Sequence, residues 1–153
     1  MLLTESESGA PYQLSEMEIY GKGGLVPHPH QPLAESDNRQ FLSGGNWKLQ
    51  RASQVNGSGE AISKIGYSDS DWIPATVPGT VLTSYMNIGA IPNPNFADNQ
   101  LQISESYFLS DFWYRNEFTV TNPADYVFLN FDGINWKANI FLNGKNTGNI
   151  DGA

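Results

Sequence analysis

The sixteen carboxylic acids of the sequence are the first residues to consider for chemistry, because carboxyl groups serve both as acid–base groups and as nucleophiles. Such work needs two of them held about 5 Å apart, with the pKa of one raised by its surroundings. The pairs close enough in sequence to be considered are Glu16 with Glu18, Asp69 with Asp71, and Glu105 with Asp111. The first two lie among polar neighbours, as solvated acids do. We assign no catalytic residue to this chain.

Other reactive or ligand-binding patterns are weak. His28 and His30 flank one proline and have no clustered third ligand, so we expect neither a metal site nor a cofactor. The chain has no cysteine, which excludes thiolate zinc sites, disulfides and cysteine nucleophiles. It also lacks the Gly-x-Ser-x-Gly elbow of serine hydrolases and any glycine-rich phosphate loop.

The best candidate for a binding site is the segment 91–105, IPNPNFADNQLQISE. It reads as a long loop, and long loops inside compact domains are often functional. The alternative is that its asparagines satisfy the hydrogen bonds of their own turns. The side chains that bring amide, carboxylate and aromatic groups together here are Asn93, Asn95, Phe96, Asp98 and Asn99.

Length and charge limit the class of protein. The chain has 153 residues, enough for one domain, and its 39% hydrophobic content can support a core. Eight basic and sixteen acidic residues give a net charge of −8, which argues against binding to nucleic acid or to anionic lipid. No run of about 18 apolar residues is present, so we expect no membrane span. The 15 glycines and 9 prolines favour a β-rich fold with many turns.

The periodicity of apolar residues predicts the elements that must position this loop. One helix is expected, with Thr80 as its N-cap and Gly89 after its end. Residues 56–59 read as a loop or hairpin tip, 72–79 as extended chain, and Asn143-Gly144 as a hairpin turn. Strands are expected at 47–51, 112–120, 127–131, 136–142 and 145–150, of which 127–131 is apolar on both faces like a central strand.

Strands at this spacing predict an all-β, two-layer sandwich of the jelly-roll kind. The strand count falls short of the eight that such a fold has, which leaves one sheet edge open. We therefore expect a piece of a larger domain, truncated at its C-terminal end. The open edge and uncovered apolar face predict low stability, self-association, or both.

Five short motifs follow one another along the chain: Trp72-x-Pro74-Ala75-Thr76-Val77-Pro78-Gly79-Thr80-Val81, Gly89-x-Ile91-Pro92-Asn93-Pro94-Asn95-Phe96, Phe112-Trp113-Tyr114-Arg115-x-Glu117-Phe118, Phe131-Asp132-Gly133-Ile134 and Leu142-Asn143-Gly144-Lys145. In this order they resemble the N-terminal sugar-binding domain of glycoside hydrolase family 2. The resemblance covers residues 41–153 and is strongest to the β-mannosidase and exo-β-glucosaminidase branch.

The resemblance implies a jelly-roll, galactose-binding-domain-like sandwich without catalytic residues of its own. In the family this domain precedes an immunoglobulin-like domain and a (β/α)₈ barrel that carries the catalytic carboxylates. Its partners are then carbohydrate and those downstream domains. The loop corresponding to 91–105 approaches the rim of the barrel's active site, so Asn93, Asn95, Asp98 and Asn99 would be substrate-rim residues. A bacterial parent enzyme would be periplasmic or secreted.

The front of the chain resembles a different module. Residues 12–21, YQLSEMEIYG, are similar to the last strand of a discoidin-type carbohydrate-binding module. We thus expect a remnant of that module at 1–24, a proline-rich linker at 25–40, and the incomplete family 2 domain at 41–153.

Three hypotheses remain open. The chain is a non-catalytic domain of an exo-acting glycosidase, a free-standing carbohydrate-binding β-sandwich with an exposed aromatic platform, or a purely structural fragment with no activity. For Trp113, Tyr114 and Trp136 we expect packing in the core or between sheets rather than sugar contact, and for Arg115 and Glu117 a structural ion pair.

Overall fold

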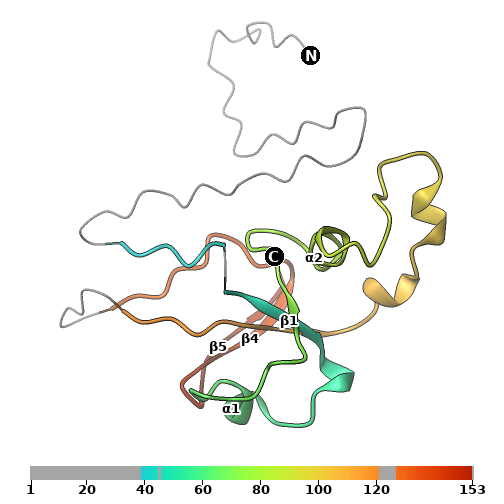
Figure 1. Ribbon diagram of the computed structural model, residues 1–153. Coiled ribbons are helices and arrows are strands. Elements are labelled where there is room, and N and C mark those ends of the chain that lie inside the picture. The colour runs from blue at the N-terminus through green and yellow to red at the C-terminus, as the bar shows by residue number, and fades with distance from the viewer. Residues whose placement is uncertain (1–38, 45, 121–126, 153) are drawn as a thin grey trace, which may run out of the picture.

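The computed structural model describes residues 39–44, 46–120 and 127–152 (Figure 1). Within these residues five strands form two antiparallel sheets: three strands in the order β2-β1-β3, and the hairpin β4-β5. The elements in chain order are β1 (Lys48–Arg51), η1 (Ala52–Gln54), α1 (Gly59–Ile62), β2 (Ile73–Pro74), α2 (Val81–Asn87), η2 (Asn99–Gln102), η3 (Glu105–Tyr107), β3 (Phe112–Arg115), β4 (Lys137–Leu142) and β5 (Lys145–Asp151).

The structure confirms the strand that the alternating sequence predicted at 47–51, and this strand, β1, lies at the centre of the larger sheet. Leu49 of this strand is fully buried, and it pairs with Ile73 of β2 on one side and Tyr114 of β3 on the other. The expected extended segment 72–79 contributes only two residues to the sheet. Pro74 lies in the edge strand, where its missing N–H costs no ladder hydrogen bond.

The hairpin β4-β5 confirms the turn predicted at Asn143-Gly144. Both residues have left-handed backbone angles, with φ of 49° for Asn143 and 83° for Gly144. A two-residue turn with positive φ at both positions matches the right-handed twist of the strands it joins, and asparagine and glycine tolerate that conformation best. The turn chemistry therefore sets the pairing next to the turn, and an irregularity between Ile140 and Phe141 shifts the register farther along the hairpin.

Helix α2 also begins and ends where the sequence predicted. The Thr80 hydroxyl accepts a hydrogen bond from the Thr83 backbone N–H at 3.1 Å, which caps the helix, and Gly89 follows its end with φ of 74°. Ser84 is fully buried. Its hydroxyl accepts from the Thr76 N–H at 3.0 Å and donates to the Thr80 carbonyl at 3.1 Å, which fastens the helix to the preceding segment.

Helix α1 was not predicted, since Gly59 was assigned to a loop or hairpin tip. The helix packs against the hairpin so closely that a Cβ at Gly59 would overlap the ring of Phe141 in β4. The same ring lies 5.9 Å from that of Trp113 in β3, so the two sheets meet here. Leu49, Ile62 and Trp72 form the small buried core.

Two strand predictions are wrong in extent or existence. The strand expected over 112–120 ends at Arg115, and 127–131 is not a strand at all. Val127 is 61% exposed and Phe128 is 81% exposed. A segment that is apolar on both faces needs neighbouring strands and covered faces, and among the described residues no strand pairs with this one.

Several predictions fall on residues 1–38, which lie outside the described part of the chain. These are the discoidin-like strand and the part of the linker that carries His28 and His30, and they stay predictions. Within the described residues, no helix is long and apolar enough to cross a membrane.

Candidate functional site

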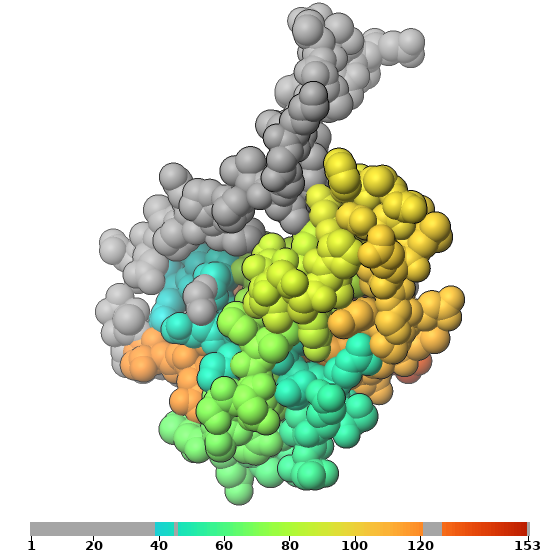
Figure 2. Space-filling view, turned by 45° about the vertical axis from the view of Figure 1, so that its right-hand side comes forward, coloured from blue at the N-terminus to red at the C-terminus, as the bar shows by residue number. Residues whose placement is uncertain are grey.

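The loop 91–105 projects from the body of the molecule between α2 and β3. In Figure 1 it leaves α2 and turns away from the strands before it returns through η3. In Figure 2 its yellow surface stands at the upper right edge of the molecule. The loop is not without structure, because η2 spans Asn99–Gln102 and η3 follows at Glu105–Tyr107. It therefore presents its polar side chains from a defined backbone.

The structure brings the candidate residues together around Asn93. The Asn93 side-chain oxygen accepts from the Asn95 N–H at 2.9 Å, and its carbonyl accepts from the Asn99 side-chain amide at 2.9 Å and from the Phe96 N–H at 3.2 Å. Asn93 and Asn99 are half-buried and thus act in the turn itself. Asn95 and Asp98 are exposed, and Phe96 is 70% exposed. These three side chains are the candidate residues that the loop exposes to solvent.

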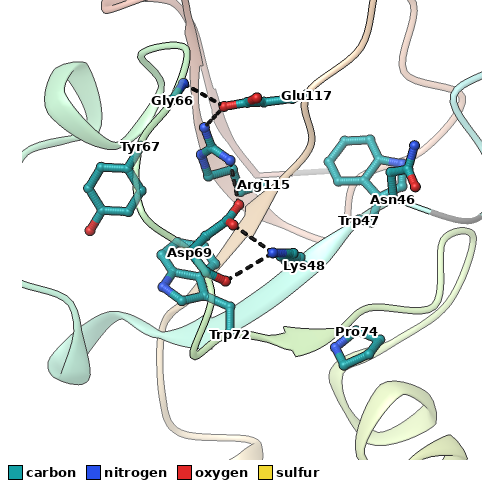
Figure 3. A pocket seen from close by; sticks show the side chains of 10 residues that line it. All are labelled: Asn46, Trp47, Lys48, Gly66, Tyr67, Asp69, Trp72, Pro74, Arg115 and Glu117. Carbon is teal, nitrogen blue, oxygen red and sulfur yellow. Dashed lines mark hydrogen bonds and ion pairs between the residues drawn. The ribbon is translucent and has the colours of Figure 1, made fainter.

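A second polar region lies between β1, β3 and the segment that leads from α1 to β2. It is a cavity of about 390 Å³, with Trp47, Tyr67 and Trp72 in its wall (Figure 3). Four charged side chains form a chain across it in the order Glu117, Arg115, Asp69 and Lys48. Sequence reasoning anticipated the Arg115–Glu117 pair but took Asp69 for a solvated acid. Asp69 instead binds both Arg115 and Lys48, the latter at 2.6 Å.

Every nitrogen of the Arg115 guanidinium has a partner. Nε donates to the Ile62 carbonyl at 3.0 Å, and Nη2 donates to the Lys64 carbonyl at 3.0 Å. Nη1 binds Asp69, and Nη2 also binds Glu117. Arg115 is only 8% exposed, so its charge is neutralised inside the protein. The side chain joins β3 to the segment after α1.

The ionised forms of both acids are stabilised in this network. Burial alone would raise the pKa of Asp69, but hydrogen bonds from Lys48 and Arg115, together with their charges, outweigh it and lower that pKa. The hydrogen bonds from Arg115 and from the Gly66 N–H, the latter at 2.9 Å, lower the pKa of Glu117. Acids with lowered pKa values do not donate protons near neutral pH. The network is suited to holding the fold rather than to general acid catalysis.

The aromatic residues divide between packing and exposure. Trp113 is half-buried against Phe141, as predicted. The prediction is wrong for Trp136, which is 64% exposed and has φ of 70°, with the Lys137 ammonium 5.8 Å from its ring.

No local signal in the sequence identifies Asp69 as a partner of Arg115, since the two lie 46 residues apart. The described residues contain no group of three or more His, Cys, Asp or Glu side chains able to hold a metal ion.

An antiparallel β domain that projects one long polar loop is an architecture common among ligand-binding modules. The chain belongs to the family described as glycosyl hydrolase 2 galactose-binding domain-like, which matches residues 28–153. This confirms the family predicted from the five sequence motifs.

The related proteins are glycosidases. The chain is 30% identical over 119 residues to an exo-beta-D-glucosaminidase of Streptomyces avermitilis, covering 78% of the chain and 13% of that relative. It is 27% identical over 129 residues to the exo-beta-D-glucosaminidase of Amycolatopsis orientalis, covering 84% of the chain and 12% of that relative. It is 29% identical over 114 residues to a mannosylglycoprotein endo-beta-mannosidase of Lilium longiflorum, covering 69% of the chain and 12% of that relative. The chain thus spans about one-eighth of the length of these relatives. No solved structure gives a significant match.

Proposed function

We propose that this chain acts as the non-catalytic sugar-binding domain of an exo-acting glycoside hydrolase family 2 enzyme. In this proposal residues 41–153 belong to a jelly-roll sandwich that further strands complete, with a linker at 25–40 and the remnant of another module at 1–24. The loop 91–105 lines the rim of an active site whose carboxylates are carried by another domain. Asn95, Phe96 and Asp98 face the substrate, and Asn93 and Asn99 hold the loop in shape.

The observation that carries the proposal is the family match, together with the small share of each relative that the chain covers. The organisation of the acids agrees with it. Asp69 is bound by two cations, and Asp71 beside it is exposed, so this pair does not form a catalytic dyad. The projecting loop, in contrast, offers exposed amide, carboxylate and aromatic groups with which sugars can be bound.

The first test is the coding DNA on either side of this sequence. We expect the reading frame to continue after Ala153 into further strands and then into a barrel domain that carries two spaced carboxylates. A stop codon directly after Ala153 would contradict the proposal. In the enzyme found this way, Asn95→Ala and Asp98→Ala should lower kcat/KM, whereas Asn56→Ala, in the exposed turn before α1, should leave it unchanged.

The chain by itself provides a second test. We expect no turnover of a β-D-glucosaminide or β-D-mannoside reporter above the buffer rate. Because the loop alone supplies only part of a pocket, we also expect a Kd for glucosamine or mannose weaker than about 1 mM. Turnover by the purified chain would overturn the non-catalytic assignment.

One observation favours the alternative, a free-standing carbohydrate-binding β-sandwich. Trp136 is 64% exposed, and an exposed indole face can stack on a sugar ring. This function predicts saturable binding of an oligosaccharide that is lost in Trp136→Ala and kept in Asn95→Ala. The glycosidase-domain proposal predicts that Trp136→Ala changes nothing at the loop.

A further inference from the structure

The base of the loop is closed by one cation and three aromatic rings, which we call the loop clasp: Arg51, Tyr85, Tyr107 and Phe112. The Arg51 guanidinium lies 4.9 Å from the ring centre of Tyr107 and 5.3 Å from that of Phe112. The ring of Tyr85 lies 4.8 Å from that of Tyr107 and 6.4 Å from that of Phe112, both with the edge of one ring toward the other. The four side chains therefore form a closed ring of contacts.

The loop clasp joins the two ends of the loop to the sheet. Tyr85 belongs to α2, from which the loop departs, and Tyr107 belongs to η3, through which it returns. Phe112 begins β3, and Arg51 ends β1. Backbone hydrogen bonds at 2.9 Å, from the Ala90 N–H to the Tyr85 carbonyl and from the Ala52 N–H to the Asp111 carbonyl, fix the chain on either side.

Arg51 supplies most of the polar bonds in the loop clasp. Its Nη1 donates to the Ser106 carbonyl at 3.1 Å and to the Ser110 hydroxyl at 2.8 Å, and its Nη2 donates to the Ser106 hydroxyl at 3.0 Å. None of the ion pairs among the described residues includes Arg51. Its charge is directed at ring faces and at loop oxygens instead of a carboxylate. A planar guanidinium can stack and bond in this way at once, which an ammonium cannot.

We propose that Arg51 is a positioning residue for the loop 91–105: it closes the base of the loop so that the side chains around Asn93 are presented in one arrangement. This inference rests on the proposed function for its biological meaning, because it assigns the loop clasp to a rim that faces sugar. The contacts between Arg51 and the loop are a property of this chain and do not depend on that function. Arg51 touches no candidate rim residue and acts through Tyr107 and the two serines.

The test is amide hydrogen exchange of the complete chain, followed by NMR, in Arg51→Met and in Arg39→Met. Methionine keeps an apolar stem and removes the guanidinium, and Arg39 is an exposed arginine outside the loop. In Arg51→Met we expect protection of the Leu101 and Leu109 amides to fall about tenfold, as for loss of a hydrogen-bonded charged group. Protection in the hairpin β4-β5 should stay within about twofold. Arg39→Met should change neither.

A spectroscopic signature separates positioning from general weakening. The side-chain amide signals of Asn99, which is bonded to the Asn93 carbonyl, should shift in Arg51→Met while those of Asn146 in β5 stay in place. Arg51→Lys keeps the charge but not the planar fork, so it should not restore the native signals. Unchanged loop exchange in Arg51→Met, or an equal loss of protection in the loop and in β4-β5, would overturn the proposal.

Two further outcomes are informative. If Arg51→Met fails to fold, Ser110→Ala serves in its place, because it removes one acceptor of Arg51. It should lower loop protection and shift the Asn99 signals in the same way, by smaller amounts. A Ser110→Ala spectrum identical to that of the native chain would then overturn the proposal. None of these measurements uses a sugar. A chain whose loop responds as expected but that belongs to no glycosidase would refute the proposed function and leave the role of Arg51 standing.

Discussion

Replacement of Arg115 by methionine tests whether the charged chain across the cavity holds the fold together. The substitution removes a buried guanidinium and keeps an apolar stem of similar length. It removes the Arg115 donor from the Ile62 carbonyl and one of two donors from the Lys64 carbonyl, which keeps the Tyr67 N–H at 3.3 Å. It also takes from Asp69 and Glu117 their shared cation. The segment after α1 then loses its polar connection to β3.

The size of the effect follows from burial. Removal of one partner of a buried ion pair costs about 3–5 kcal/mol, because the other charge remains uncompensated. Here Asp69 keeps Lys48 at 2.6 Å, and the Glu117 side chain is 48% exposed and regains water. We therefore expect the lower end, a loss of about 3 kcal/mol in the free energy of unfolding. That is a large part of the 5–15 kcal/mol typical of a domain.

The assay is urea unfolding followed by tryptophan fluorescence, with linear extrapolation to water. The matched control is Lys137→Met, which breaks the pair with Asp151 at 2.9 Å. The side chains of Lys137 and Asp151 are 63% and 78% exposed. An exposed pair of this kind contributes at most about 1 kcal/mol. If Arg115→Met costs no more than the control, the network does not stabilise the fold and the reasoning fails.

The same network predicts how stability depends on pH. The pKa of Asp69 is lowered from its ordinary value of 3.8, and that of Glu117 from 4.5. Near pH 4 the unfolded chain therefore binds more protons than the folded chain, so stability rises with pH. The contribution is complete above these ordinary values and is lost as the pH falls through the lowered ones. Urea midpoints measured from pH 3 to 6 should follow this course in the native chain and a flatter one in Arg115→Met; equal slopes would contradict it.

Two further substitutions test local features of the fold. Gly59→Ala places a methyl group in the ring of Phe141, so we expect the free energy of unfolding in the same assay to fall by about 1–3 kcal/mol. Gly148→Ala is the control, because the space around its Cβ position is open, and it should change the free energy of unfolding by less than about 0.5 kcal/mol. Similar values for the two variants would argue against the close contact of α1 with β4. Thr80→Ala removes the cap of α2 and should cost about 1 kcal/mol, with Thr80→Ser retaining most of it. A Thr80→Ala chain as stable as the native one would mean that the buried Ser84 holds the helix without its cap.

The structural features that could be predicted from the sequence are those that depend on residues adjacent in the chain. The cap at Thr80, the stop at Gly89 and the turn at Asn143-Gly144 each follow from the chemistry of a few adjacent residues, and the structure confirms all three. The alternation over 47–51 predicted β1 for the same reason. The order of the five motifs identified the family, which the comparison confirms.

What was missed depends on residues far apart in the chain. Helix α1 begins at a glycine because the Phe141 ring, 82 positions later, leaves no room for a larger side chain. Asp69 is half-buried, and Arg115 and Lys48 bind it from two strands. The apolar run 127–131 reads as a central strand, yet burial of both its faces depends on neighbours that the described residues do not include.

The loop itself cannot supply the cation that closes it. Residues 65–114 contain no lysine, arginine or histidine, so every positive charge near the loop must come from outside this stretch. Arg51 provides it from the end of β1, and β1 is held in register by β3. The closed loop base therefore includes a residue whose position depends on the β1-β3 pair. Local unfolding at this sheet edge should release the loop before the hairpin β4-β5 opens, and so the arrangement of the candidate rim residues depends on a strand they do not touch.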